Sequence, residues 1–164
     1  MAVFLAGRDH IQIRQLHRRI KNRFQSNDRF ETVQLRVAEP RDPGPYRVIG
    51  DVDAQRFLAD TTYPTTTARI EIGFQIPDRS SHECYWFNWI EPNRQFLLGW
   101  HQDGDHPNLG PTHLQLNQGG TAVDHESAVF IDKHPMAIVE ARLQQLPDAL
   151  TRVRWKNETI VGIE

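Results

Sequence analysis

The chain has 164 residues, which is enough for one domain and too few for two. Its 8 Phe, 4 Trp and 3 Tyr can fill a core and argue against disorder, and a single cysteine, Cys84, excludes a disulfide framework or a cysteine-based zinc site. No run approaches the roughly 18 apolar residues that span a bilayer, and residues 3–6 are too short for a signal peptide. We therefore expect one cytoplasmic domain over residues 1–164 and no membrane partner.

Charge is distributed unevenly along the chain. Residues 1–60 contain 11 Lys and Arg against 8 Asp and Glu, whereas residues 61–134 contain 4 against 9 and hold six of the eight histidines. The basic end suits an anionic partner, and the acidic, histidine-rich middle suits chemistry or metal binding.

The N-terminal segment, residues 1–30, is predicted to be helical, with a helix over residues 9–24. Its apolar residues recur every three or four positions, as one stripe of a helix requires, at Ile13, Leu16, Ile20 and Phe24. Basic residues cover much of the remaining surface: Arg14, Arg18, Arg19, Lys21 and Arg23. We predict that this basic face binds the phosphates of a nucleic acid, and the alternative is an ordinary solvated face.

Residues 31–164 are predicted to form a sheet followed by a C-terminal helix. Alternation of apolar and polar residues predicts strands, and the expected strands are 32–37, 46–49, 68–76, 84–90, 95–101, 112–116 and 128–131, with a short helix at 53–60. The aromatic strands at 84–90 and 95–101 form a predicted hairpin. These elements indicate an α+β fold with a mainly antiparallel sheet.

The last elements follow from proline and from apolar spacing. Pro135 is expected at the start of a helix whose buried stripe includes Met136 and Leu146, and Pro147 is expected to end or kink it. Residues 153–155 are expected to close the sheet as an edge strand. We interpret His125 as a loop residue and His134 as a helix cap, and the alternative is that both extend a site formed by the preceding segment, residues 99–113.

Segment 99–113 contains most of the residues suited to chemistry. It combines three glycines and two prolines with His101, Asp103, Asp105, His106 and His113. Because His101 ends one predicted strand and His113 lies near the start of the next, a hairpin would bring them together. The loop between them would place its own polar side chains beside that pair.

Such a cluster could cleave RNA through the 2′-hydroxyl group. The reaction needs a base, an acid and a cation on the phosphate, and two imidazoles can share the first two roles because histidine titrates near neutral pH. We predict that His106 pairs with His113 or His101. Asp103 or Asp105 would orient one imidazole. The scheme needs no metal or cofactor.

Two points leave other interpretations open: the source of the cation for the phosphate, and the similarity of these side chains to metal ligands. Arg94 lies at the opposite turn, so the N-terminal helix is the predicted source of the cation. The residues also match the imidazole and carboxylate ligands of zinc, as a set of His101, Asp105, His106 and His113. Their spacing fits no established signature, and the segment could equally be a turn.

Residues 68–146 resemble the TumE-like toxins of toxin–antitoxin modules. In that family a Gly-Asp-His-x-His stretch follows a strand with an Asp-Asn pair, and here Gly104, Asp105 and His106 match the stretch. At the position of the second histidine of the family's stretch, this chain has Asn108. Where the family has the Asp-Asn pair, this chain has Gln102 and Asp103. The resemblance implies a toxin that acts on RNA and is neutralised by an antitoxin protein.

The leading hypothesis is therefore an RNA-targeting, metal-independent ribonuclease. One alternative is a non-catalytic binding protein that meets a partner through its aromatic sheet or N-terminal helix. The other is a metal-dependent hydrolase.

Overall fold

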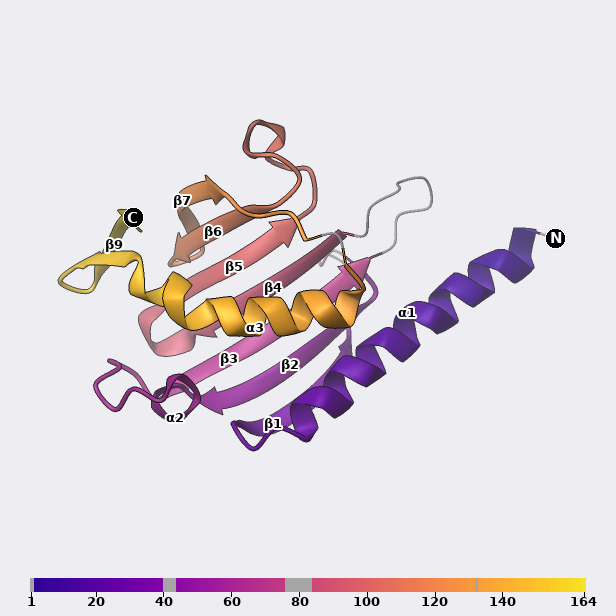
Figure 1. Cartoon of the computed structure of the whole chain (residues 1–164), viewed down its shortest axis with the longest axis horizontal. Helices are drawn as coiled ribbons and strands as arrows, with labels where there is room; N and C mark the ends of the chain where they lie inside the picture. The colour runs from indigo at the N-terminus through magenta and orange to yellow at the C-terminus, as the bar shows by residue number, and fades with distance from the viewer. Residues whose placement is uncertain (1, 40–43, 76–83, 132) are drawn as a thin grey trace.

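The structure is a computed structural model that describes residues 2–39, 44–75, 84–131 and 133–164, with side chains described from residue 12 onward. Seven antiparallel strands form one sheet, in which their order in space is their order in the chain (Figure 1). The strands are β1 (Phe30–Val37), β2 (Tyr46–Asp53), β3 (Thr67–Gln75), β4 (Cys84–Glu91), β5 (Phe96–Gln102), β6 (His113–Gln118) and β7 (Thr121–Ser127). The predicted α+β fold with a mainly antiparallel sheet is confirmed.

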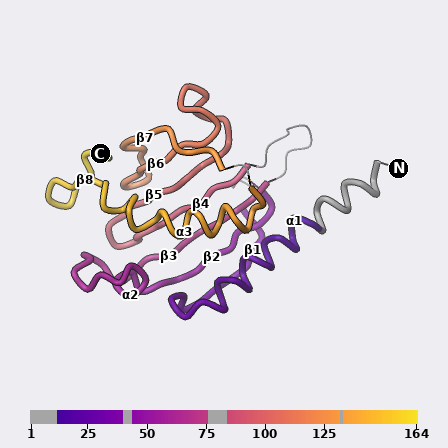
Figure 2. Tube along the Cα trace, in the orientation of Figure 1, coloured from indigo at the N-terminus to yellow at the C-terminus, as the bar shows by residue number. Residues whose placement is uncertain are grey.

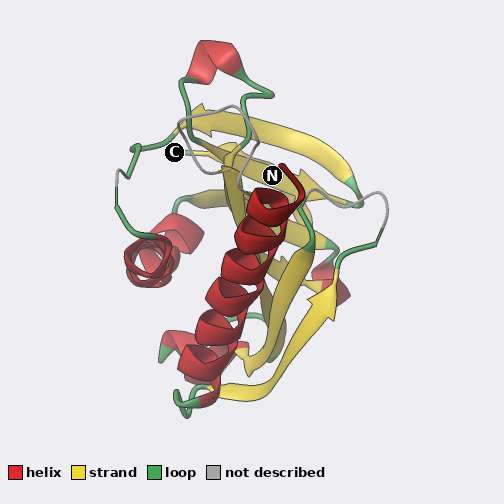
Figure 3. Cartoon of the chain, turned by 90° about the vertical axis from the view of Figure 1, so that its right-hand side faces the viewer, coloured by secondary structure: helices red, strands yellow, loops and turns green. Residues whose placement is uncertain are grey.

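The two long helices, α1 (Ala2–Gln25) and α3 (Pro135–Thr151), both lie over the same face of the sheet (Figure 1; Figure 3). Ile20 and Phe24 of α1 are almost fully buried, and they belong to the same apolar core as the buried residues of α3. The N-terminal helix predicted at 9–24 is confirmed, and its backbone begins earlier, at Ala2. The path of the chain runs from α1 through the sheet to α3 and a final hairpin (Figure 2).

The alternation of side chains gives the sheet a core face and an opposite face. On β3, Ile70 and Ile72 are fully buried in the core, while Glu71 between them points to the other side. The short helix α2 (Ala54–Leu58) also packs into the core, through Phe57. We call the side opposite the helices the open face, because none of the three described α-helices packs there.

Antiparallel pairing carries one row of residues across the open face. Gly73 pairs with Trp86, Trp86 with His101, and His101 with His113. Directly paired residues on neighbouring strands project to the same side of a sheet. The register therefore places both histidines on the open face.

The prediction of a strand at 128–131 was wrong, because the strand that follows β6 is β7, which spans Thr121–Ser127. Gly119 and Gly120 have φ angles of 60° and 76°, a left-handed conformation that glycine adopts without steric cost. This tight turn follows β6 directly, so the chain reverses earlier than the apolar pattern suggested.

Two expectations for the C-terminal segment are corrected. Pro147 does not end α3: it lies inside the helix, which continues to Thr151, because the turn after the proline buries Ala149 and Leu150 against the core. The expected edge strand, β8 (Val153–Lys156), pairs only with β9 (Thr159–Ile163) in a separate two-stranded sheet. In the described part of the chain, no helix has the length and apolar character needed to cross a bilayer.

Candidate active site

His101 and His113 come together as predicted. They are paired residues on β5 and β6, and the centroids of their rings lie 5.5 Å apart. His113 is almost fully buried, with 2% of its surface exposed, whereas His101 is partly exposed. Because strand pairing sets their separation, neither histidine depends on a loop for its position.

The loop between β5 and β6 returns His106 and Asp103 to this pair. Its two glycines, Gly104 and Gly110, have φ angles of 79° and 86°, a conformation that residues with a Cβ adopt at a cost. The ring centroid of His106 lies 4.6 Å from that of His113. The loop predicted from glycine and proline content therefore does carry its histidine to the strands.

Asp103 is the carboxylate that lies beside the imidazoles. Its Oδ2 is 3.9 Å from Nδ1 of His101, and its Oδ1 is 4.0 Å from Nδ1 of His113. Oδ1 also accepts a hydrogen bond of 3.0 Å from the backbone N–H of Asp105, which fixes the loop. Asp105 belongs to neither group of potential ligands in the described residues. Of the two predicted aspartates, the structure thus brings Asp103 to the histidines.

A fourth histidine, His125, completes the cluster. The sequence favoured a loop role for it, with an extension of the site as the alternative. His125 lies on β7 opposite Gln115, and its ring centroid is 4.2 Å from that of His106 and 5.7 Å from that of His113. The sequence feature that could have placed His125 on a strand is the Gly119-Gly120 turn. A hairpin built on that turn returns His125 alongside β6.

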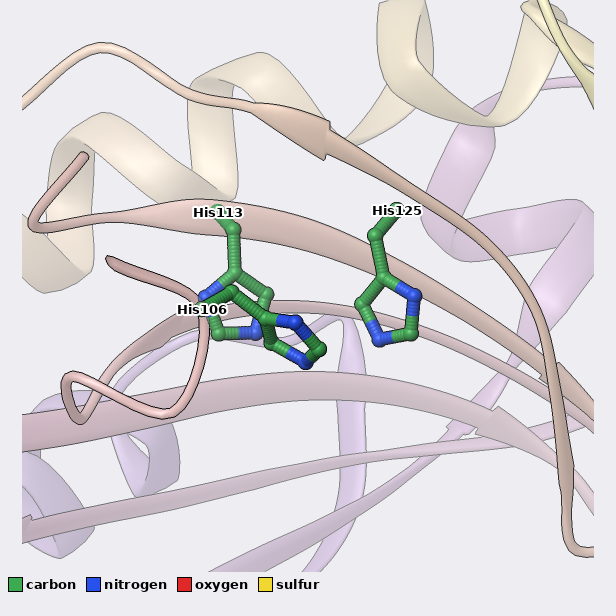
Figure 4. A group of neighbouring side chains, drawn as sticks. All are labelled: His106, His113 and His125. Carbon is green, nitrogen blue, oxygen red and sulfur yellow. The ribbon is translucent and has the colours of Figure 1, made fainter. Parts of the chain in front are cut away.

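The three imidazoles of His106, His113 and His125 are turned toward one another (Figure 4). One ring nitrogen from each lies within 4.8 Å of the others. A second group, formed by His101, Asp103 and His113, meets the same limit and shares His113. These side chains come from two strand pairs and a loop, so the cluster is a product of the tertiary fold.

Burial and mutual repulsion lower the pKa values of three of the histidines. Desolvation, followed by the neighbouring His113, lowers the pKa of His101 to about 4. Desolvation is also the main cause of the lowered pKa of His113 and of His125. These three imidazoles are therefore neutral at physiological pH, and each then has one nitrogen lone pair available.

Asn88, on β4, fixes the orientation of His101. Nε2 of His101 donates a hydrogen bond of 2.8 Å to Oδ1 of Asn88. In the neutral ring this leaves an unprotonated Nδ1, which faces the carboxylate of Asp103 at 3.9 Å. Gly99 makes room for the contact, because a Cβ there would lie 2.0 Å from the Asn88 oxygen. Sequence reasoning missed Asn88, which only the β4–β5 register brings to the site.

The predicted phosphate-binding residues are not near the cluster. They lie on α1, which packs on the core face, whereas the histidines lie on the open face. Arg14, Arg18 and Arg19 are exposed, Lys21 is partly exposed, and Arg23 forms an ion pair of 2.6 Å with Glu140 of α3. Helix α1 and the histidines thus lie on opposite sides of the sheet.

Most aromatic rings of these strands belong to the core, whereas Trp86 lies on the open face with the Arg47 guanidinium 4.0 Å from its ring centroid. Trp86, Trp89 and Trp100 have 5%, 0% and 4% of their surface exposed, so these rings offer little area to a partner. Ile13 and Ile20 of α1 are also buried within the chain. Among the side chains that the structure describes, which on α1 begin at residue 12, neither surface proposed for a binding protein presents a large apolar area.

Comparison with known proteins identifies no relative of this chain. No family model, no curated protein and no solved structure matches the chain.

Proposed function

We propose that this protein cleaves RNA at the cluster formed by His101, Asp103, His106, His113 and His125. The observation that supports the proposal most is the convergence of four imidazoles and a carboxylate on one face of the sheet. Titratable groups with shifted pKa values that gather from separate segments are typical of sites of proton transfer or metal binding.

The chemistry follows from the 2′-hydroxyl group of RNA. A base removes the proton of that hydroxyl, and its oxygen forms a bond to the adjacent phosphorus. The bond between the phosphorus and the 5′-oxygen breaks, and an acid gives this oxygen a proton. The products are a 2′,3′-cyclic phosphate and a 5′-hydroxyl end.

His106 and His113 are the predicted acid–base pair of the metal-free scheme. Their ring centroids are 4.6 Å apart, and of the two rings the partly exposed His106 is the one open to a phosphodiester. Asp103 takes the orienting role, since its carboxylate lies beside Nδ1 of His113. The scheme also requires a positive charge on the phosphate, and the basic residues of α1 lie across the sheet from it.

The position of the cluster supports a polymeric substrate. A strand of RNA can approach the open face, which the described helices leave uncovered, and would meet the partly exposed His101 and His106 before the buried His113. The resemblance to TumE-like toxins at Gly104, Asp105 and His106 points to the same substrate and to an antitoxin partner. Where that pattern has a second histidine, this chain has Asn108, and His125 stands beside His106 instead.

The test is an incubation of the purified protein with total RNA. Wild type and His134→Asn should cleave, while His106→Ala should not. His134 lies outside the cluster and caps α3 by accepting a hydrogen bond from the N–H of Met136, a role that asparagine also performs well. Cleavage by His106→Ala at the wild-type rate would reject the proposal.

A further inference from the structure

The histidine cluster is rich in electron-pair donors. The carboxylate of Asp103 lies 3.9 Å from Nδ1 of His101 and 4.0 Å from Nδ1 of His113. The fixed charge beside these two imidazoles is therefore negative. Cleavage of a phosphodiester needs a positive charge at this place.

We infer that His106, His113 and His125 bind one divalent transition-metal ion, for which Zn²⁺ is the best fit. Three imidazole nitrogens are an established ligand set for zinc, and they leave the fourth tetrahedral position open to water or substrate. Imidazole also suits zinc better than magnesium or calcium, which prefer oxygen ligands. The inference deepens the proposed function, because it names the cation of the same site.

The geometry needs only a small closure. Zinc–nitrogen bonds of about 2.0 Å place the ligand nitrogens of a tetrahedral site roughly 3.3 Å apart. The three nitrogens already lie within 4.8 Å of one another. His113 is fixed on a strand, whereas His106 lies in a loop and is partly exposed, so rotation of its side chain can close the site.

Asp103 supports the same assignment. Histidine ligands of metals commonly have a carboxylate beside their second ring nitrogen, which orients the ring and raises its basicity. The Asp103 carboxylate stands 4.0 Å from Nδ1 of His113. It also faces Nδ1 of His101, a second electron-pair donor, so an adjacent cation would stabilise both groups.

Metal binding changes which groups transfer protons. An imidazole bound to metal through one nitrogen no longer acts as the base, so the pair of His106 and His113 is replaced. His101 and Asp103 are not among the three proposed ligands, and both lie beside His113, so they would be left to transfer protons. The ion itself supplies the positive charge that the phosphate requires.

The test measures metal binding without RNA. Protein stripped with EDTA and dialysed is titrated with Zn²⁺ by calorimetry and with Co²⁺ by visible absorption. We expect one ion per chain in wild type and in His134→Asn. In His106→Ala and in His125→Ala, the affinity should fall by more than the roughly 10- to 100-fold that loss of a supporting partner costs. Circular dichroism of the metal-free variants shows whether they are folded.

Two results would overturn the inference: no stoichiometric binding by folded wild type, or equal affinity in wild type and in both folded variants. Failure of this inference is separable from failure of the proposed function. RNA cleavage that survives EDTA would leave the function without the metal, and tight zinc binding without cleavage of RNA would leave the metal without the function.

Discussion

His101 and His113 are directly paired across β5 and β6, so that two imidazoles with lowered pKa values stand 5.5 Å apart on the open face. Strand pairing rather than a flexible loop holds them there. Asp103 lies between their Nδ1 atoms, at 3.9 Å and 4.0 Å. The other two histidines then extend this core, one from the loop and one from β7.

His106→Ala separates catalysis from stability. His106 is partly exposed and lies in a loop, so its removal should cost no more than about 0.5 kcal/mol of unfolding free energy. For a chain of this size that is a change in melting temperature of about 2 °C or less. Cleavage of RNA should nevertheless be lost. A large fall in melting temperature would make the residue structural.

Asp103→Asn and Asp105→Asn should differ, although the two residues lie in the same loop. Asp103 flanks two imidazoles, so its neutral variant should lose roughly 10- to 100-fold in zinc affinity and in the rate of RNA cleavage. Asp105→Asn should match wild type in both assays. Equal losses in the two variants would show that the loop as a whole, rather than the Asp103 carboxylate, is responsible.

Gly99→Ala tests the packing that supports His101. The added Cβ would lie 2.0 Å from Oδ1 of Asn88 and 3.0 Å from Nε2 of His101, which is too close for their hydrogen bond to persist. Overpacking of this kind costs about 1 to 3 kcal/mol. Urea denaturation should show that loss, together with reduced cleavage. An unchanged unfolding midpoint would contradict the contact.

Stability should fall with pH through His17, which is far from the cluster in the chain. His17 is fully buried, and desolvation, the largest cause, lowers its pKa below 6.5. Nδ1 donates to the carbonyl of Ile13 at 2.7 Å, and Nε2 accepts from the N–H of Phe74 at 3.1 Å, so protonation breaks the second bond.

The unfolded chain therefore takes up this proton at a higher pH than the folded chain does. The contribution of His17 is complete above pH 6.5 and is lost as the pH falls below that value. Urea unfolding at pH 7.5 and 5.0 should show a larger loss of stability in wild type than in His17→Gln, which does not titrate. Identical pH dependence would exclude His17 as a contributor.

Local patterns predicted much of this fold. Apolar spacing located α1, and alternation located β3, because burial of one face imposes a period on each element. The pairing of His101 with His113 was also predictable, since one short loop joins their strands. By contrast, β7 was misplaced because its residues are largely exposed, which leaves no clear apolar alternation. His125 was therefore interpreted first as a loop residue, and its place in the site was only the alternative.

Longer-range relationships could not be predicted. The contact of Asn88 with His101 depends on the β4–β5 register, and a slip of one residue would send Asn88 to the other face. The separation of α1 from the histidines depends on which face of the sheet the helix covers. The sequence of the helix alone does not determine that face. For the same reason the basic residues of α1 were expected at the site and lie across the sheet from it.

The most direct test of the account is to follow RNA cleavage by one sample as its metal is removed and returned. Wild type treated with EDTA should lose cleavage and regain it on addition of one equivalent of Zn²⁺, while His125→Ala should stay inactive throughout and His134→Asn should follow wild type. Restored metal without restored cleavage, or full cleavage by folded His125→Ala, would contradict the assignment of this cluster as a metal-dependent site of RNA cleavage.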